Sequence, residues 1–192
     1  MALFFIEMGQ GIVVDGDVSV CTSTLFSCSL IAGWNQNTNA AGAYHYPASS
    51  LGKADVLADM NAWAARLQPT QVILVVAEAM NALEVQTFGR DEAALQAWIQ
   101  QQCQVAAAVD HQTAAAMCFQ NGHFSAGVPS ALPGGSGAFG RSSAISVTNR
   151  QAGVYPDHGG FTLIGHDREN APRAAVHATN ANANKPACCI IL

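Results

Sequence analysis

The sequence predicts an α/β (α+β) protein in which mixed, mostly antiparallel β-sheets form a sandwich-like core that packs with two or more helices. Three observations predict this class. Short β-rich runs separated by Gly and Asp turns fill the first third of the chain. Two later segments repeat apolar residues at helical spacing, and further short apolar runs follow them.

Strands are expected over residues 3–7, 11–14 and 18–24, because these runs are apolar, β-rich and bounded by turn residues. Residues 25–34 and 42–47 flank the sequence NQNTNAA, whose asparagines favour turns. We expect these two segments to form a hairpin with a long loop.

The first expected helix covers residues 54–69, where apolar side chains recur at helical spacing and Pro69 closes the segment. The second covers residues 91–104. Between them, the apolar run QVILVVA at 71–77 predicts a strand that is buried on both faces. Further strands are expected over residues 105–110, 115–120, 143–148 and 160–166.

The length of 192 residues fits one domain, which we place at residues 1–180, with residues 181–192 as a polar tether that ends in CCIIL. Only 7% of the residues are aromatic, so the core is expected to consist of aliphatic side chains. The Gly/Pro/Ser-rich stretch at 127–143 is long enough to be a functional loop.

Charge and cysteine placement exclude several classes of protein. The net charge of −5 and the lack of a Lys/Arg run argue against binding to nucleic acid or to an acidic membrane surface. The six cysteines form neither a small disulfide framework nor C-x-x-C pairs, which favours a reducing compartment. The first ten residues lack the basic region of a signal peptide. We expect no metal and no cofactor, because His, Cys and Asp are too sparse for ligand spacing.

A candidate catalytic group lies in residues 21–48. Cys28 and His45 fall on neighbouring antiparallel strands of the expected hairpin, where an imidazole can stabilise a thiolate and then protonate a leaving group. The hydroxyl of Thr22 could orient the ring, and the backbone N–H groups of Ser27 and Cys28 could bind an oxyanion. The alternative is that Cys28 is simply a small buried hydrophobic residue.

The other cysteines and histidines fit structural roles better. Cys21 is expected to face the opposite side of its strand from Val18, Val20 and Thr22. Cys103 and Cys118 have no partner nearby in the sequence. The histidines at positions 111, 123, 158 and 177 are expected to be surface or structural residues.

The segment around Cys28 resembles the chemoreceptor glutamine deamidase (CheD) family, whose motif has the form T-x-x-x-x-S-C followed by G-G-x-x-H. Thr22, Ser27 and Cys28 stand at the matching places, and His45 follows at that family's spacing, with Gly42 three residues before it. The resemblance covers about residues 18–126. More loosely, the chain is similar to deamidase toxins of the cytotoxic necrotizing factor type.

Three departures from the family pattern concern substrate recognition more than chemistry. Phe26 replaces the usual glycine before S-C, and Ala41 replaces the first glycine before the histidine. The sequence HQTAAAM stands where the family carries G-G-x-x-G-R. The lost glycines and the additional C-terminal third favour an effector or toxin over a chemotaxis protein.

The resemblance implies a cysteine-dependent amidohydrolase that converts a glutamine of a target protein to glutamate, with Cys28 as nucleophile and His45 as acid and base. The expected partner is a protein substrate, such as a host signalling protein. The same pair could instead serve a cysteine peptidase or a transglutaminase, or the chain could be an inactive interaction module. The protein would be cytoplasmic in its producer or enter a host cell without a cleaved signal.

The last residues suggest a lipid attachment site. Cys189-Ile190-Ile191-Leu192 fits the C-a-a-X prenylation pattern, and Cys188 could carry a second lipid. One lipid chain binds membranes only marginally, so stable anchoring would need both cysteines. Membrane association is therefore expected only if the protein meets a prenyltransferase. The alternative is an apolar terminal strand.

Overall fold

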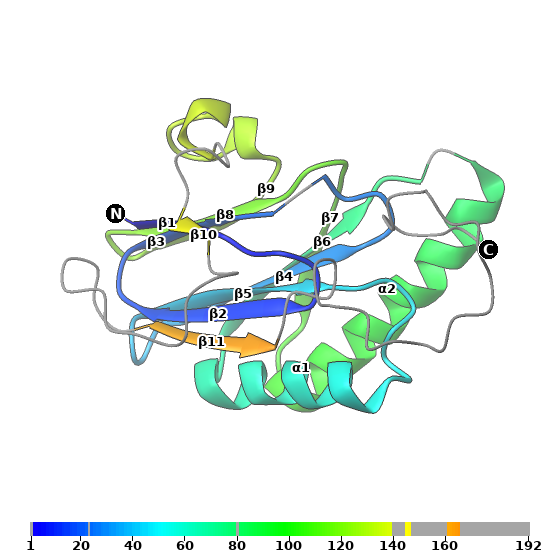
Figure 1. Ribbon diagram of the computed structural model, residues 1–192. Helices are drawn as coiled ribbons and strands as arrows, with labels where there is room; N and C mark the ends of the chain where they lie inside the picture. Colours follow the sequence, from blue (N-terminus) through cyan, green and yellow to red (C-terminus); the bar gives the residue numbers. More distant parts are fainter. Residues whose placement is uncertain (1, 23, 80, 140–144, 147–160, 166–192) are drawn as a thin grey trace, which may run out of the picture.

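The structure is a computed structural model that describes residues 2–22, 24–79, 81–139, 145–146 and 161–165. These residues form three layers: a five-stranded sheet, a six-stranded sheet and two helices that cover the outer face of the larger sheet (Figure 1). The predicted class of mixed, mostly antiparallel sheets packed with helices is confirmed.

The smaller sheet, sheet A, has the strand order β10-β1-β3-β8-β9. Strand β1 runs parallel to β3 and β10, whereas β8 pairs antiparallel with β3 and β9. The strands are β1 (Ala2–Phe5), β3 (Val18–Cys21), β8 (Ala116–Gln120), β9 (His123–Gly127) and β10 (Ile145–Ser146).

The larger sheet, sheet B, has the order β11-β2-β5-β4-β6-β7, and only the β6–β7 pair is parallel. Its centre is the β4–β5 hairpin, in which Ser29 pairs with Tyr46 and Leu30 with His45. The strands are β2 (Gln10–Asp15), β4 (Ser29–Asn35), β5 (Ala40–Tyr46), β6 (Gln71–Ala77), β7 (Ala107–Gln112) and β11 (Phe161–Gly165).

Two helices, α1 (Ala54–Leu67) and α2 (Ala82–Cys103), cover one face of sheet B. In α1 the buried residues recur every three or four positions, which places them on one face of the helix. Asn81 caps the N-terminus of helix α2: its side chain accepts a hydrogen bond from the backbone N–H of Glu84 and thereby satisfies one of the unpaired donors of the first turn.

Apolar residues gather in three places. One core fills the space between the two sheets, and a second lies between sheet B and the helices. A smaller cluster covers the outer face of sheet A, to which the 3-10 helices Pro129–Ala131 and Ser136–Phe139 contribute Leu132, directly after the first helix, and Phe139, the last residue of the second. The part of the predicted 127–143 loop that the structure describes, residues 127–139, thus packs on the outer face of sheet A.

The chain crosses three times between the sheets in its first third, and two of these crossings lie close to the candidate site. Residues 6–9, here called the 6–9 turn, lead from β1 in sheet A to β2 in sheet B, and residues 22–28 lead from β3 in sheet A to β4 in sheet B (Figure 1). Because β5 ends where β2 and β4 begin, both crossings lie at the same end of the sandwich. The region around Cys28 and His45 is at this end.

Several sequence-based boundaries are corrected. Strand β4 begins at Ser29, so residues 25–28 are not part of it, and only residues 36–39 separate β4 from β5 in place of the long loop. Helix α2 begins nine residues before the predicted position 91, and strand β9 was not predicted. The expected tether at 181–192, with Cys188 and Cys189, lies outside the described residues.

Candidate active site

Cys28 and His45 face the same layer of the protein. In β5, Ala41 and Ala43 belong to the core between the sheets, so strand alternation places His45 on that face. Cys28, directly before β4, belongs to the same core as Leu30, the residue that pairs with His45. His45 lies on β5 as predicted, whereas Cys28 is not on the neighbouring strand but directly before its first residue, Ser29.

His45 is deeply buried and makes no side-chain hydrogen bond with the part of the chain that the structure describes. Its residue is 1% exposed, and neither Nδ1 nor Nε2 has a hydrogen-bonding partner there. Burial lowers the pKa of His45 from 6.5 to about 4, and a contact of the ring with the backbone of Ile6, which does not meet the geometry of a hydrogen bond, opposes this change in part. The ring is therefore neutral near pH 7, and in the described conformation it is a weaker base than an exposed imidazole.

The thiol of Cys28 is also buried, with 4% of the residue exposed. Its Sγ lies 3.5 Å from Sδ of Met8, within the distance of a weak S–H···S hydrogen bond. Met8 belongs to the 6–9 turn and is itself partly exposed. The described conformation thus places the thiol against a thioether, and the ion pair with the imidazole is not formed.

The 6–9 turn also contacts His45. Gly9 has a φ of 86°, a left-handed conformation that favours glycine, and its N–H donates a 2.8 Å hydrogen bond to the carbonyl oxygen of His45. Ile6, at the other end of the turn, donates to the carbonyl oxygen of Cys21 at 3.0 Å. One short segment therefore lies against both members of the Cys–His pair.

Thr22 and Ser27 lie in the crossing from β3 to β4. The backbone N–H of Thr22 donates to the carbonyl oxygen of Ala115 at 3.3 Å, which extends the pairing of sheet A by one residue. Thr22 is partly buried, but its hydroxyl is not a hydrogen-bonding partner of the His45 ring. Ser27 is also partly buried and lies in the bend before β4, next to Cys28.

Comparison with known proteins identifies no relative. No protein family, no curated protein and no solved structure matches the chain. The interpretation of the site therefore depends on its own geometry and on the sequence motif.

The remaining described cysteines have structural positions. Cys21 and Cys118 pack in the cluster on the outer face of sheet A, and Cys103 packs against the core beneath the helices. The predicted orientation of Cys21, away from Val18 and Val20, is confirmed. Burial raises the pKa of Cys103 to about 11, which makes it a poor nucleophile near neutral pH.

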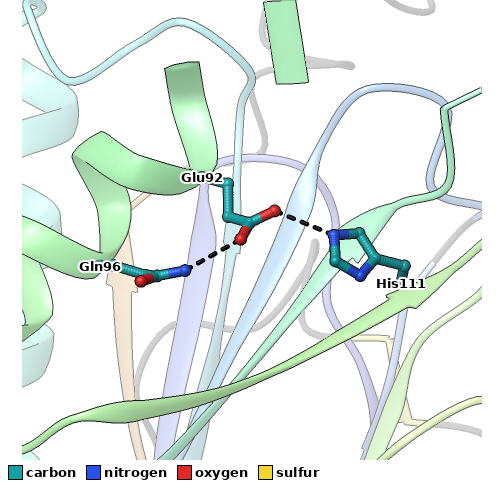
Figure 2. Close-up of polar contacts among 3 residues, drawn as sticks. All are labelled: Glu92, Gln96 and His111. Carbon is teal, nitrogen blue, oxygen red and sulfur yellow. Dashed lines mark hydrogen bonds and ion pairs between the residues drawn. The ribbon is translucent and has the colours of Figure 1, made fainter. Parts of the chain in front are cut away.

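Two of the remaining histidines, His111 and His123, are exposed, as predicted. Figure 2 shows His111 on β7 directing Nε2 at Oε2 of Glu92 on α2, at 2.9 Å, while Gln96 donates to Oε1 of the same carboxylate. This contact joins the edge strand of sheet B to a helix on the protein surface. Positions 158 and 177 lie outside the described residues.

A partly buried hydrogen-bond network follows His45 directly. Tyr46 donates from its hydroxyl to Oδ1 of Asp91 at 2.9 Å and accepts from the backbone N–H groups of Ser50 and Leu51 at 2.8 and 3.1 Å. Oδ2 of Asp91 accepts from the N–H of Ser49 at 2.9 Å. The network ties the end of β5 to α2. Burial raises the pKa of Asp91 and, together with the Asp91 charge, that of Tyr46.

Within the described ranges, no group of three or more His, Cys, Asp or Glu side chains is placed to hold a metal ion. Nor does any helix there combine the length and the hydropathy that a membrane crossing requires.

The sequence interpretation missed Met8, which lies 20 residues from Cys28, because nothing in the sequence indicates that the 6–9 turn crosses between the sheets.

Proposed function

We propose that this chain is a cysteine-dependent amidohydrolase that deamidates a glutamine of a target protein. One observation carries the proposal: the buried imidazole of His45, without a hydrogen-bonding partner among the described residues, shares a sheet face with the thiol of Cys28. An imidazole and a thiol are the two groups that a cysteine hydrolase requires, because the imidazole can take up the thiol proton and then give it to the leaving group.

In the first half of the reaction, neutral His45 accepts the proton of Cys28, and the thiolate attacks the carbon of the glutamine carboxamide. Backbone N–H groups at Ser27 and Cys28 are the proposed donors to the oxyanion. His45 then transfers its proton to the nitrogen. The C–N bond breaks, ammonia leaves, and a thioester joins the substrate to Cys28.

In the second half, water gives a proton to His45 and attacks the thioester carbon. The C–S bond breaks, and the sulfur of Cys28 recovers the proton from His45. One carboxamide and one water become one carboxylate and one ammonium ion. The target protein thus gains a negative charge and loses a hydrogen-bond donor, which is enough to change an interface.

The active arrangement requires a local change from the described one, because Cys28 Sγ lies against Met8 Sδ. Catalytic hydrogen bonds are often long or absent before substrate binds and tighten only in the complex. Cys28 and Leu30 share a sheet face, and Leu30 is the cross-strand partner of His45. The thiol and the ring are therefore in roughly diagonal positions, which lie about 7–8 Å apart in a sheet, so the change must move Cys28, directly before β4, toward the ring.

The setting proposed for this activity is a bacterial effector or toxin that acts on a host signalling protein. The motif formed by Thr22, Ser27, Cys28 and His45, similar to that of glutamine deamidases, supports this setting.

The test of the activity is incubation of host-cell lysate with the wild-type protein and with Cys28→Ser, followed by mass spectrometry. We expect glutamine-to-glutamate shifts at specific sites with the wild type and none above background with Cys28→Ser or His45→Ala. Cys118→Ser is the matched control, because it removes a buried thiol from the opposite side of sheet A. It should leave the activity unchanged.

Other outcomes separate the remaining candidates. New peptide termini would indicate a peptidase, and cross-linked or amine-labelled glutamines would indicate transglutaminase activity from the same thioester. No difference between wild type and Cys28→Ser would contradict catalysis by this thiol. An inactive interaction module would then be the better interpretation.

A further inference from the structure

The position of Met8 has a steric consequence for any substrate of Cys28. A carboxamide carbon must come within about 3–3.5 Å of the attacking sulfur before reaction. Sδ of Met8 is 3.5 Å from that sulfur, so the thioether occupies part of the space through which the carbon would approach. Met8 is partly exposed, whereas Cys28 is 4% and His45 1% exposed. Met8 is thus the one of these three residues that reaches the surface.

The 6–9 turn that carries Met8 closes one end of the space between the sheets, because it is the connection from sheet A to sheet B (Figure 1). Its attachment to His45 is a backbone hydrogen bond from Gly9, which does not depend on the Met8 side chain. The Met8 side chain can therefore change rotamer while the turn remains in place. Methionine is suited to this, since it is unbranched and has three rotatable side-chain bonds.

We infer that Met8 is the gating residue of the candidate active site: the glutamine side chain of the substrate enters over the 6–9 turn and displaces the Met8 thioether from Cys28. This inference rests on the proposed function, since it names the route to the proposed nucleophile. It assigns Met8 a positioning role, in which the thioether keeps the thiol covered and protonated until a substrate side chain takes its place.

The test measures access to Cys28 by alkylation with iodoacetamide under native conditions, with the modified cysteine identified by peptide mass spectrometry. Met8→Ala should increase the alkylation rate of Cys28 about tenfold or more, because it removes the group that covers the sulfur. Met8→Leu retains a side chain of similar volume and should leave the rate within about twofold of wild type.

Cys21 and Cys118 are internal controls, because they are 2% and 1% exposed and pack in a different cluster. If Met8→Ala merely loosened the fold, the alkylation of these two cysteines would rise together with that of Cys28, and the inference would fail. Equal Cys28 rates in wild type and Met8→Ala would also overturn it.

The labelling measures access and not hydrolysis, so the two proposals can fail separately. Fast labelling of Cys28 in Met8→Ala without any deamidation by the wild type would support Met8 as the gating residue and contradict the proposed deamidase activity. Deamidation by the wild type with unchanged labelling of Cys28 in Met8→Ala would support the deamidase activity. It would also show that substrate reaches Cys28 by another route.

Discussion

Gly42, three residues before His45, illustrates how single residues set the position of the candidate site. A Cβ atom at this position would collide with the carbonyl oxygen of Ile12 on the neighbouring strand β2. Strands β2 and β5 can therefore approach each other at this point only because position 42 has no side chain. The glycine in the motif thus has a packing reason in this fold, independent of any role in catalysis.

Gly42→Ala should lower the free energy of unfolding by about 2–3 kcal/mol, because backbone atoms of two central strands would have to separate. Gly52→Ala is the matched control, since an added Cβ there meets nothing within 4 Å. Urea unfolding followed by circular dichroism measures both. A cost for Gly42→Ala no larger than that for Gly52→Ala would show that the β2–β5 contact relaxes without penalty.

Helix α2 and strand β5 are joined through Tyr46, and this contact bears on how His45 is held. The Tyr46 hydroxyl satisfies two backbone N–H groups of the 47–51 segment and donates to Asp91 on α2. Because Tyr46 alternates with His45 along β5, its side chain faces the helices while the imidazole faces sheet A. A single strand therefore carries the candidate base on one face and its structural support on the other.

Tyr46→Phe should destabilise the protein by about 1–3 kcal/mol, because it leaves two backbone donors and the Asp91 carboxylate without their partner. Asp91→Asn should cost less, because an amide oxygen can still accept the hydrogen bond from Tyr46. Denaturant unfolding of the two variants gives the comparison. A larger loss of stability in Asp91→Asn than in Tyr46→Phe would mean that the charge of Asp91 contributes more to stability than the hydrogen bonds of the Tyr46 hydroxyl.

The sequence predicted most elements because their patterns are local. Continuous apolar runs identified β6, and helical spacing of apolar residues identified α1. The start of α2 was missed because Val85, Thr87 and Gly89 are weak helix formers, although Asn81 and Glu84 carry a capping signal. Strand β9, HFSAG, was missed because it is short and holds several small residues.

The candidate site was predictable only in part. Alternation along β5 and the hairpin register bring Cys28 and His45 to one face, and both features follow from local sequence. The contact between Met8 and Cys28 depends on how two sheets pack, which is set by contacts distant in sequence. For the same reason the expected contact between Thr22 and the ring could not be tested from the sequence, and it is not formed among the described residues.

For the molecule as a whole, the buried His45 predicts loss of stability in acid. Burial holds its pKa at about 4 in the folded protein, whereas an exposed histidine of the unfolded chain has a pKa of 6.5. As the pH falls through this window, the unfolded chain takes up a proton that the folded protein does not, so the free energy of unfolding decreases by up to about 3 kcal/mol. The raised pKa of Asp91 has the opposite sign and offsets part of this loss.

Urea unfolding at pH 7 and pH 4.5 tests this with His45→Leu, which cannot titrate and fits an apolar core. The wild type should lose more stability than this variant between the two pH values. His111→Gln, at an exposed position, should behave as the wild type does. Parallel losses in wild type and His45→Leu would show that His45 does not govern the acid sensitivity.

The crossings at residues 6–9 and 22–28 also set the order in which Cys28 becomes protected during folding. The residues that surround it come from both sheets, and sheet A is incomplete until β8, which ends at Gln120, has joined β3. Until then the sulfur is open to solvent even if the β4–β5 hairpin has formed. Refolding followed by thiol reactivity should therefore be slower than refolding followed by far-ultraviolet circular dichroism. The last event should be the docking of the two sheets.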